Sequence, residues 1–227
     1  TAVGTDSLQA NTTASDNVAV GSSSLKSNTT GTYNTALGYC SLATNATTNS
    51  NVAVGYNALK VNVASNNTAV GTSSLDANTS GANNVALGVA ALGANTTGAT
   101  NIAIGSGALD ANTTASDNTA VGHNSLSANT TGADNVAMGS CALDSNTTGA
   151  SNVAIGYSAL TTNTTAASNT AVGHLALRYN TTGTQNTAVG KSAMTANTSG
   201  GYSVAVGNSA LTAQTTGANN VAVGRIA

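Results

Sequence analysis

The most regular feature of this chain is the spacing of its apolar residues. An aliphatic residue directly precedes a glycine every 17 residues, from Val3 to Val223, with one interval of 16. A leucine recurs five residues after this aliphatic residue, as Leu25 follows Val20. Asn, Thr and Ser dominate the other positions. A short period that runs from end to end is typical of a solenoid, in which each coil stacks on its neighbours.

The repeat unit reads N-[TV]-A-[VIL]-G-x-x-[AS]-L-x-x-N-T-T-[GA]-x-x, and residues 152–168 are a representative copy. The segment from the first Asn to the Gly predicts a strand of about four residues that ends in a turn. A helix is excluded by the spacing of five residues between the aliphatic residue and the leucine, and the intervening Gly would cost a helix about 1 kcal/mol in every unit. We predict two short strands per coil and an all-β fold, a β-solenoid (β-roll) of about 13 stacked 17-residue coils. The one missing residue falls between Asn62 and Asn66, inside a turn, so strand register is kept.

The alanine at the centre of the strand is the same in all 14 copies. If the aliphatic residues on either side face the core, strand alternation sends this alanine to the opposite face. A solvent-facing position would vary, so either another chain or another wall of the same coil approaches it. We favour another chain, because two large aliphatic residues per coil make a thin core. The alanines expected at this contact between chains are Ala19, Ala36, Ala53, Ala103 and Ala154.

The asparagine of the Asn-Thr-Thr segment has two interpretations. In the first, buried amides form a ladder that hydrogen-bonds to the coils above and below. In the second, the Asn-x-Ser/Thr pattern marks glycan acceptors, which must be exposed, so both cannot hold at one site. The sequons begin at Asn11, Asn28, Asn45, Asn66, Asn78, Asn95, Asn112, Asn129, Asn146, Asn163, Asn180 and Asn197.

The composition excludes several classes of partner. Only 5% of residues are charged and the formal net charge is -2, with no run of Lys or Arg. Neither nucleic acid nor an acidic membrane surface is therefore an expected partner. No apolar stretch approaches the roughly 20 residues of a membrane-spanning helix. Phe and Trp are absent and the six tyrosines fall at variable positions, which indicates an interior too narrow for rings.

The sequence offers no set of converging groups for catalysis, and we predict no enzyme activity, cofactor or metal. His123 and His174 lie three coils apart, about 14 Å at the β-sheet spacing, too far for one metal ion. Cys40 and Cys141 lie six coils apart, too far for a disulfide within one chain. They are either unpaired thiols or residues that meet their own copies in a parallel homo-oligomer.

The strand motif, as in residues 101–105 (NIAIG), is similar to the head repeats of trimeric autotransporter adhesins. The full NTAVGxxALxxNTTG unit resembles arrays in microbial surface proteins and phage tail fibres, and this resemblance covers the whole chain. It implies a left-handed β-roll with three chains packed side by side. The present repeat is longer than the adhesin-head repeat by an extra Asn-Thr-Thr segment, and no ligand site can be carried over.

These observations predict a non-enzymatic structural shaft of an extracellular fibre, surface filament or adhesin, located at a cell or virion surface. We expect self-association as a homo-oligomer, such as a trimer, or as a head-to-tail fibre. Both ends are ordinary repeat, so residues 1–227 are expected to form a single uncapped solenoid segment of a longer fibre. The alternatives are an ice-binding β-solenoid and a receptor-binding tail-fibre or adhesin module. Ice binding is less favoured because adjacent threonines such as Thr12 and Thr13 point to opposite sides of a strand.

Overall fold

A computed structural model describes all residues, 1–227, as two compact units, Thr1–Ser116 and Asp117–Ala227. Both units consist of short strands and turns without any helix. The strands of the first unit are β1 (Ala2–Val3), β2 (Val18–Val20), β3 (Thr35–Leu37), β4 (Val52–Val54), β5 (Thr68–Val70), β6 (Val85–Leu87) and β7 (Ile102–Ile104). Those of the second unit are β8 (Thr119–Val121), β9 (Val136–Met138), β10 (Val153–Ile155), β11 (Thr170–Val172), β12 (Thr187–Val189), β13 (Val204–Val206) and β14 (Val221–Val223).

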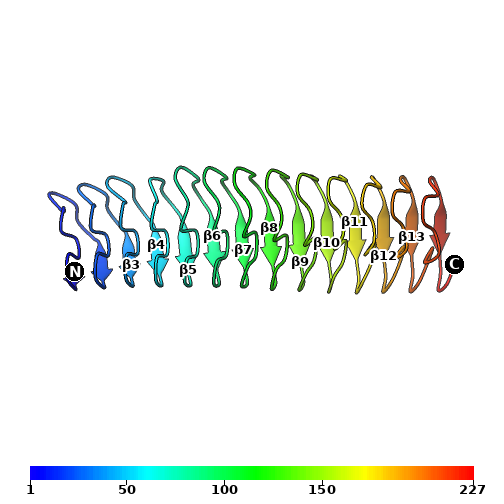
Figure 1. Cartoon of the computed structure of the whole chain (residues 1–227), viewed down its shortest axis with the longest axis horizontal. Coiled ribbons are helices and arrows are strands. Elements are labelled where there is room, and N and C mark those ends of the chain that lie inside the picture. Colours follow the sequence, from blue (N-terminus) through cyan, green and yellow to red (C-terminus); the bar gives the residue numbers. More distant parts are fainter. The chain divides into compact units, whose positions relative to one another are not determined.

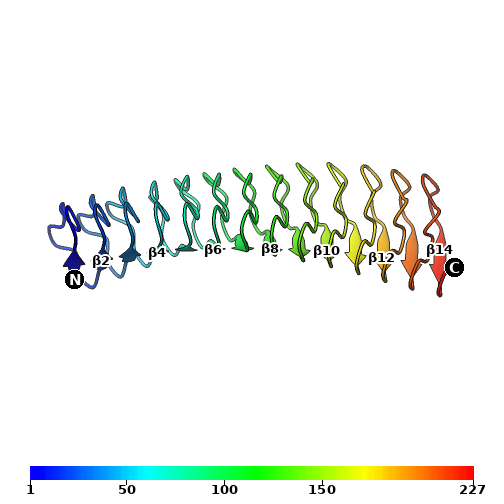
Figure 2. The same ribbon diagram turned by 60° about the horizontal axis from the view of Figure 1, so that its bottom comes forward.

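Within each unit the strands stack in chain order, and each is parallel to the next (Figure 1). Val20 pairs with Leu37 and Leu37 pairs with Val54, so equivalent residues of successive coils are neighbours. The shortened coil keeps this register, because Val52 pairs with Thr68 across an interval of 16 residues. The predicted β-solenoid of 17-residue coils is therefore confirmed. Figure 2 shows the strands along one side of each unit and the turns on the other.

Each coil contains one strand, so the prediction of two strands per coil is wrong. The segment expected to form the second strand contains the repeated leucine, whose backbone is left-handed, with φ of 48° at Leu25 and 53° at Leu126. A left-handed residue cannot continue an extended strand, and for a non-glycine residue it costs roughly 1–2 kcal/mol. The Leu25 N–H still donates to the Ser41 carbonyl of the next coil, at 3.0 Å. Complete burial of the leucine side chain offsets the backbone cost.

The strand presents alanine to the interior, which corrects the orientation expected from the sequence. The side chains of Ala19, Ala36, Ala53, Ala103 and Ala154 are 0% exposed. They lie inside the coil with the buried leucines and asparagines, and the larger aliphatic residues on either side point outward. These alanines therefore cannot contact another chain. Their constancy follows from the narrow interior, where a larger side chain would meet the opposite wall.

The glycine that closes each strand is required by the stacking. Gly88 has φ of 139°, a conformation that residues with a side chain rarely adopt. A Cβ atom at this position would lie 2.5 Å from the carbonyl oxygen of Gly105 in the next coil. Glycine thus allows both the turn and the close approach of successive coils.

The aromatic residues lie outside the coils, as the sequence predicts for a narrow interior. All six tyrosines are exposed, with exposed fractions from 46% at Tyr179 to 65% at Tyr33. The Tyr39 and Tyr56 rings stack on each other with centroids 5.5 Å apart. The interior contains Leu, Ala, Ser and Asn side chains, with Met194 in place of one leucine.

Candidate interaction surface

The asparagine of the Asn-Thr-Thr segment forms a ladder of side-chain amides inside the coil. Asn95 is representative: its Nδ2 donates to Oδ1 of Asn78 in the preceding coil at 2.8 Å. The same Nδ2 donates to the Gly98 carbonyl at 3.0 Å, which closes the turn of its own coil. Each amide thus holds its own turn and the neighbouring coil together.

The asparagine that precedes the strand forms a second column on the same carbonyl groups. Nδ2 of Asn84 donates to the Gly98 carbonyl at 2.9 Å, so this oxygen accepts from two buried amides. Oδ1 of Asn84 accepts the backbone N–H of Asn101 at 2.9 Å. Buried polar groups need hydrogen-bond partners, and here amides of both asparagine columns donate to the same buried turn carbonyl. These hydrogen bonds explain why asparagine recurs at both positions of the repeat.

In the folded coil, the asparagine side chains of ten of the twelve sequons are completely buried. A glycan would replace one of the two Nδ2 hydrogens, both of which form hydrogen bonds inside the coil, and the sugar would have no path to solvent. The prediction of glycan acceptors is therefore wrong for the 0% exposed Asn28, Asn45, Asn78, Asn95, Asn112, Asn129, Asn146, Asn163, Asn180 and Asn197. Asn11 and Asn66 are exposed, and glycosylation there stays a prediction.

The outer face of the parallel sheet is an uncharged apolar surface in each unit. It consists of the first and third residues of the three-residue strands β2 to β14, which point away from the interior. The first residue is Thr, Val or Ile in the three-residue strands, and the third is Val, Leu, Ile or Met. Several of these side chains are more than a third exposed, including Leu37 at 47% and Met138 at 42%. We call these two columns the outer sheet face.

Constancy on a solvent-facing surface was the signal for this face in the sequence. From the sequence alone, this constancy is expected at the alanine column, because the largest aliphatic residues are expected in the core. In the structure the interior is too narrow for them, so alanine points inward and the larger aliphatic residues point outward. The outward columns never carry a charged residue, although Lys, Arg and Asp occur elsewhere in the coils.

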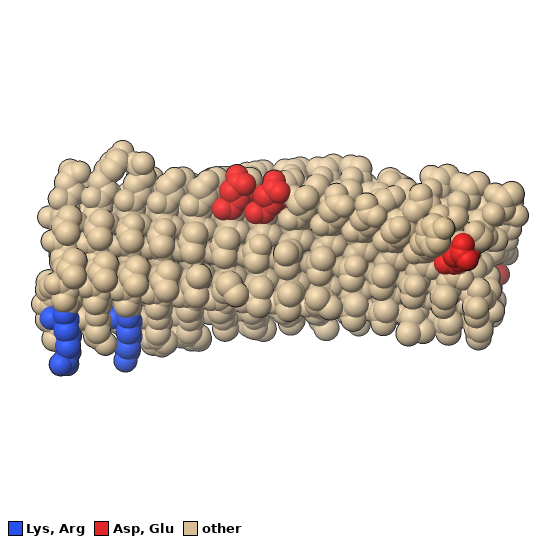
Figure 3. All heavy atoms as spheres, turned by 180° about the vertical axis from the view of Figure 1, so that it is seen from behind, with Lys and Arg blue, Asp and Glu red and all other residues tan.

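Charged and nucleophilic side chains do not converge into a site. Figure 3 shows only a few Lys, Arg and Asp side chains on the side that it presents. Lys26 and Asp6 form an ion pair at 3.1 Å. Burial raises the pKa of Asp76 and of Asp110 above the ordinary value of an aspartate. No group of three or more His, Cys, Asp or Glu residues is placed to hold a metal ion.

The histidines and cysteines have structural surroundings of their own. The His174 ring stacks on Tyr157, with ring centroids 5.5 Å apart, and both residues are exposed. Cys40 and Cys141 are free and half-buried. Neither pair forms part of a cluster of functional groups.

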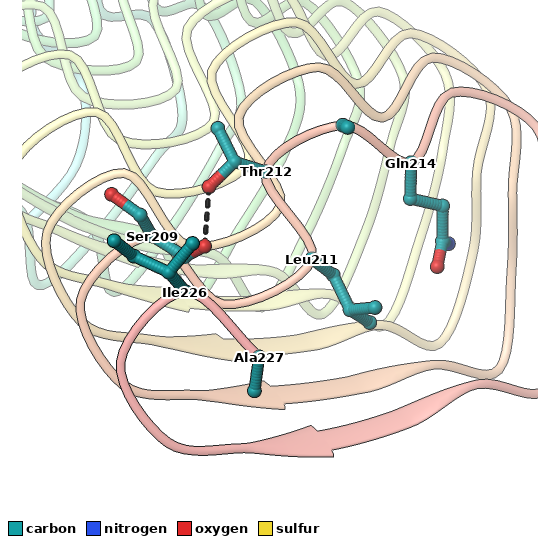
Figure 4. Close-up of a pocket in the computed structure, with 7 residues that line it drawn as sticks. Ser209, Leu211, Thr212, Gln214, Ile226 and Ala227 are labelled. Atoms are coloured by element: carbon teal, nitrogen blue, oxygen red, sulfur yellow. Dashed lines mark hydrogen bonds between the residues drawn. The ribbon is translucent and has the colours of Figure 1, made fainter.

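One hollow lies against the last coil of the second unit, lined by Leu211, Thr212, Gln214, Ile226 and Ala227 among others. Figure 4 shows these side chains around the opening, with the Thr212 hydroxyl bonded to the Ser209 carbonyl. Its lining is mainly apolar and contains no titratable side chain.

The structure contains no helix that could cross a membrane. Comparison with known proteins gives no match to a family model, a curated protein or a solved structure.

Proposed function

We propose that this chain is a non-enzymatic structural repeat, the shaft of an extracellular fibre or surface filament on a cell or virion. The observation that carries the proposal is the outer sheet face, which repeats in every coil without a charge. An apolar strip of this kind on a regular scaffold favours packing against another surface. The resemblance to surface-fibre and adhesin arrays agrees with this role.

A second copy of the same chain is the proposed partner of the outer sheet face. Both copies would carry the same two columns at the same inter-coil spacing of about 4.8 Å, so ridges and grooves match along the whole contact. Six spacings of about 4.8 Å and a strand about 10 Å long give roughly 300 Å² in each unit. A stable interface needs about 800 Å² per partner, so the strength of association should grow with the number of coils.

Ice binding remains the less favoured alternative. The outer sheet face mixes Thr with Val and Ile in one column and carries Leu and Met in the other. Side chains as different as Thr68 and Met138 do not form a uniform array of hydroxyl and methyl groups. The face instead resembles a surface that interdigitates with another apolar surface.

The test compares the full chain with a variant that carries Val136→Lys and Val153→Lys on the outer sheet face. Ser151→Lys is the control, because Ser151 is exposed in the turn that leads from the coil of Val136 into the strand of Val153. Sedimentation velocity should show assemblies for the wild type and the control, and a single chain for the double variant. Far-UV circular dichroism should show the same strand content in all three. A wild-type chain that stays monomeric at every concentration would contradict the proposal.

A further inference from the structure

The two threonines of each Asn-Thr-Thr segment have different roles. The first donates its hydroxyl to the next coil: Oγ1 of Thr96 bonds the Thr113 carbonyl and Oγ1 of Thr147 bonds the Thr164 carbonyl, both at 3.0 Å. The second threonine, such as Thr97 or Thr148, is exposed and its hydroxyl has no partner within the chain. The first hydroxyl therefore serves the fold, and the second does not.

The second position forms an exposed ridge that always carries a hydroxyl in the full-length coils. We call it the hydroxyl ridge. Its members are Thr13, Thr30, Thr47, Ser80, Thr97, Thr114, Thr131, Thr148, Thr165, Thr182, Ser199 and Thr216, and all are exposed.

Other exposed columns of the same coils contain residues of very different chemical character. The column after the strand glycine includes Tyr56, Val89, His123 and Lys191. The hydroxyl ridge exchanges only Thr for Ser, which keeps the Oγ atom and discards the methyl group. An apolar contact would retain the methyl group and release the hydroxyl. The pattern therefore indicates a requirement for the hydroxyl itself.

The stacking of the coils does not require a hydroxyl at this position. The shortened coil replaces the Thr-Thr-Gly segment with Val63-Ala64-Ser65, exposes Val63, and still stacks in register. Most of the residues at the two positions after the ridge are small, for example Gly98 and Ala99, so the hydroxyls are open to a bulky reagent. The neighbouring asparagine amides are buried and engaged.

From these observations we infer that the hydroxyl ridge is an acceptor array for O-linked sugars. In the transfer, a ridge Oγ forms a bond to the anomeric carbon of a nucleotide-activated sugar, and the bond from that carbon to the phosphate oxygen breaks. The nucleoside diphosphate leaves, and the hydroxyl proton passes to a basic group of the transferase. Ser- and Thr-rich stalks of other compositions are modified in the same way.

A neutral sugar fits the ridge better than a phosphate group. Phosphorylation would place charges of about -1.5 to -2 at successive coils about 4.8 Å apart, and like charges at that distance repel. Neutral sugars avoid this repulsion. They would also hydrate a chain that has few charged residues and an apolar sheet face.

The experiment compares the full chain isolated from its source cells with the same chain made in a bacterial cytosol without O-glycosyltransferases. The isolated chain should be heavier by whole sugar units, and mild alkaline β-elimination should remove the excess mass. Fragment mapping should place sugars at ridge positions such as Thr97 and Thr148, and none at the bonded Thr96 and Thr147. In the source cells, Thr97→Val with Thr148→Val should lose those sugars without a change in thermal unfolding, and Thr97→Ser should keep its sugar.

Equal masses for the two preparations would overturn the inference. Sugar that survives β-elimination and maps to Asn would overturn it too, since the amides would then be the acceptors. Sugars confined to threonines of the outer sheet face, such as Thr68 or Thr170, would count against the ridge in the same way. The result does not depend on whether the outer sheet face associates, so this inference and the proposed function are tested separately.

Discussion

Removal of one rung from the amide ladder should destabilise the coil far more than an exposed substitution beside it. In Asn163→Ala, Oδ1 of Asn146 loses the donor that lies at 2.8 Å. Nδ2 of Asn180 loses its acceptor at 3.1 Å but keeps the Gly183 carbonyl at 2.9 Å. The Ala166 carbonyl keeps the Asn152 amide at 2.9 Å. The substitution thus leaves one buried acceptor and one buried N–H unsatisfied.

Each unsatisfied buried group costs about 1–3 kcal/mol, so the expected loss is about 2–6 kcal/mol of unfolding free energy. The control is Thr165→Ala, two residues away on the exposed ridge, which should change stability by about 0.5 kcal/mol or less. Equilibrium urea unfolding followed by circular dichroism measures both. If Asn163→Ala costs no more than Thr165→Ala, the ladder does not hold the coils together and the structural explanation of the asparagines fails.

Three further outcomes follow from the coil. Leu143→Ala should cost about 2–5 kcal/mol in the same urea experiment, because the leucine is fully buried; a loss under 1 kcal/mol would contradict a packed interior. Gly88→Ala should lower the melting temperature measured by circular dichroism, because its Cβ would meet the Gly105 carbonyl; an unchanged melting temperature would refute that contact. Because burial raises the pKa of Asp76 and Asp110, the folded chain binds protons more readily than the unfolded chain, so stability should increase as the pH falls from neutral through the raised pKa. Asp76→Asn with Asp110→Asn should flatten this increase in urea unfolding at several pH values, and an identical pH profile would argue against the burial effect.

The period and the turn residues were sufficient to predict the class of fold. A glycine every 17 residues and an aliphatic residue before it defined the strand, its register and the position of the shortened turn, which needed only local information. The buried amide ladder could also be predicted, because an asparagine that recurs at one place in the coil, with Gln214 as the one exception, requires a partner that repeats at the same interval.

Which face of the strand points into the interior could not be predicted from the sequence. Alternation shows that Ala103 and Ile104 face opposite sides, but not which side is the interior. Side-chain size alone predicts that the larger Ile104 is buried, whereas the coil is so narrow that only Ala103 fits inside. The left-handed backbone of Leu126 was equally hidden, since leucine rarely adopts it and only the stacking of the coils stabilises it. These two features moved the candidate surface from the alanine column to its neighbours.

The most direct test of the structural role is the mass per unit length of assembled material, measured by scanning transmission electron microscopy. One chain adds a 17-residue coil, about 1.6 kDa from 21.7 kDa over 227 residues, for each rise of about 4.8 Å. Packing of copies through the outer sheet face predicts a whole-number multiple of this value, two or greater, that falls to the single-chain value in Val136→Lys with Val153→Lys. A wild-type value equal to that of one chain would contradict the account.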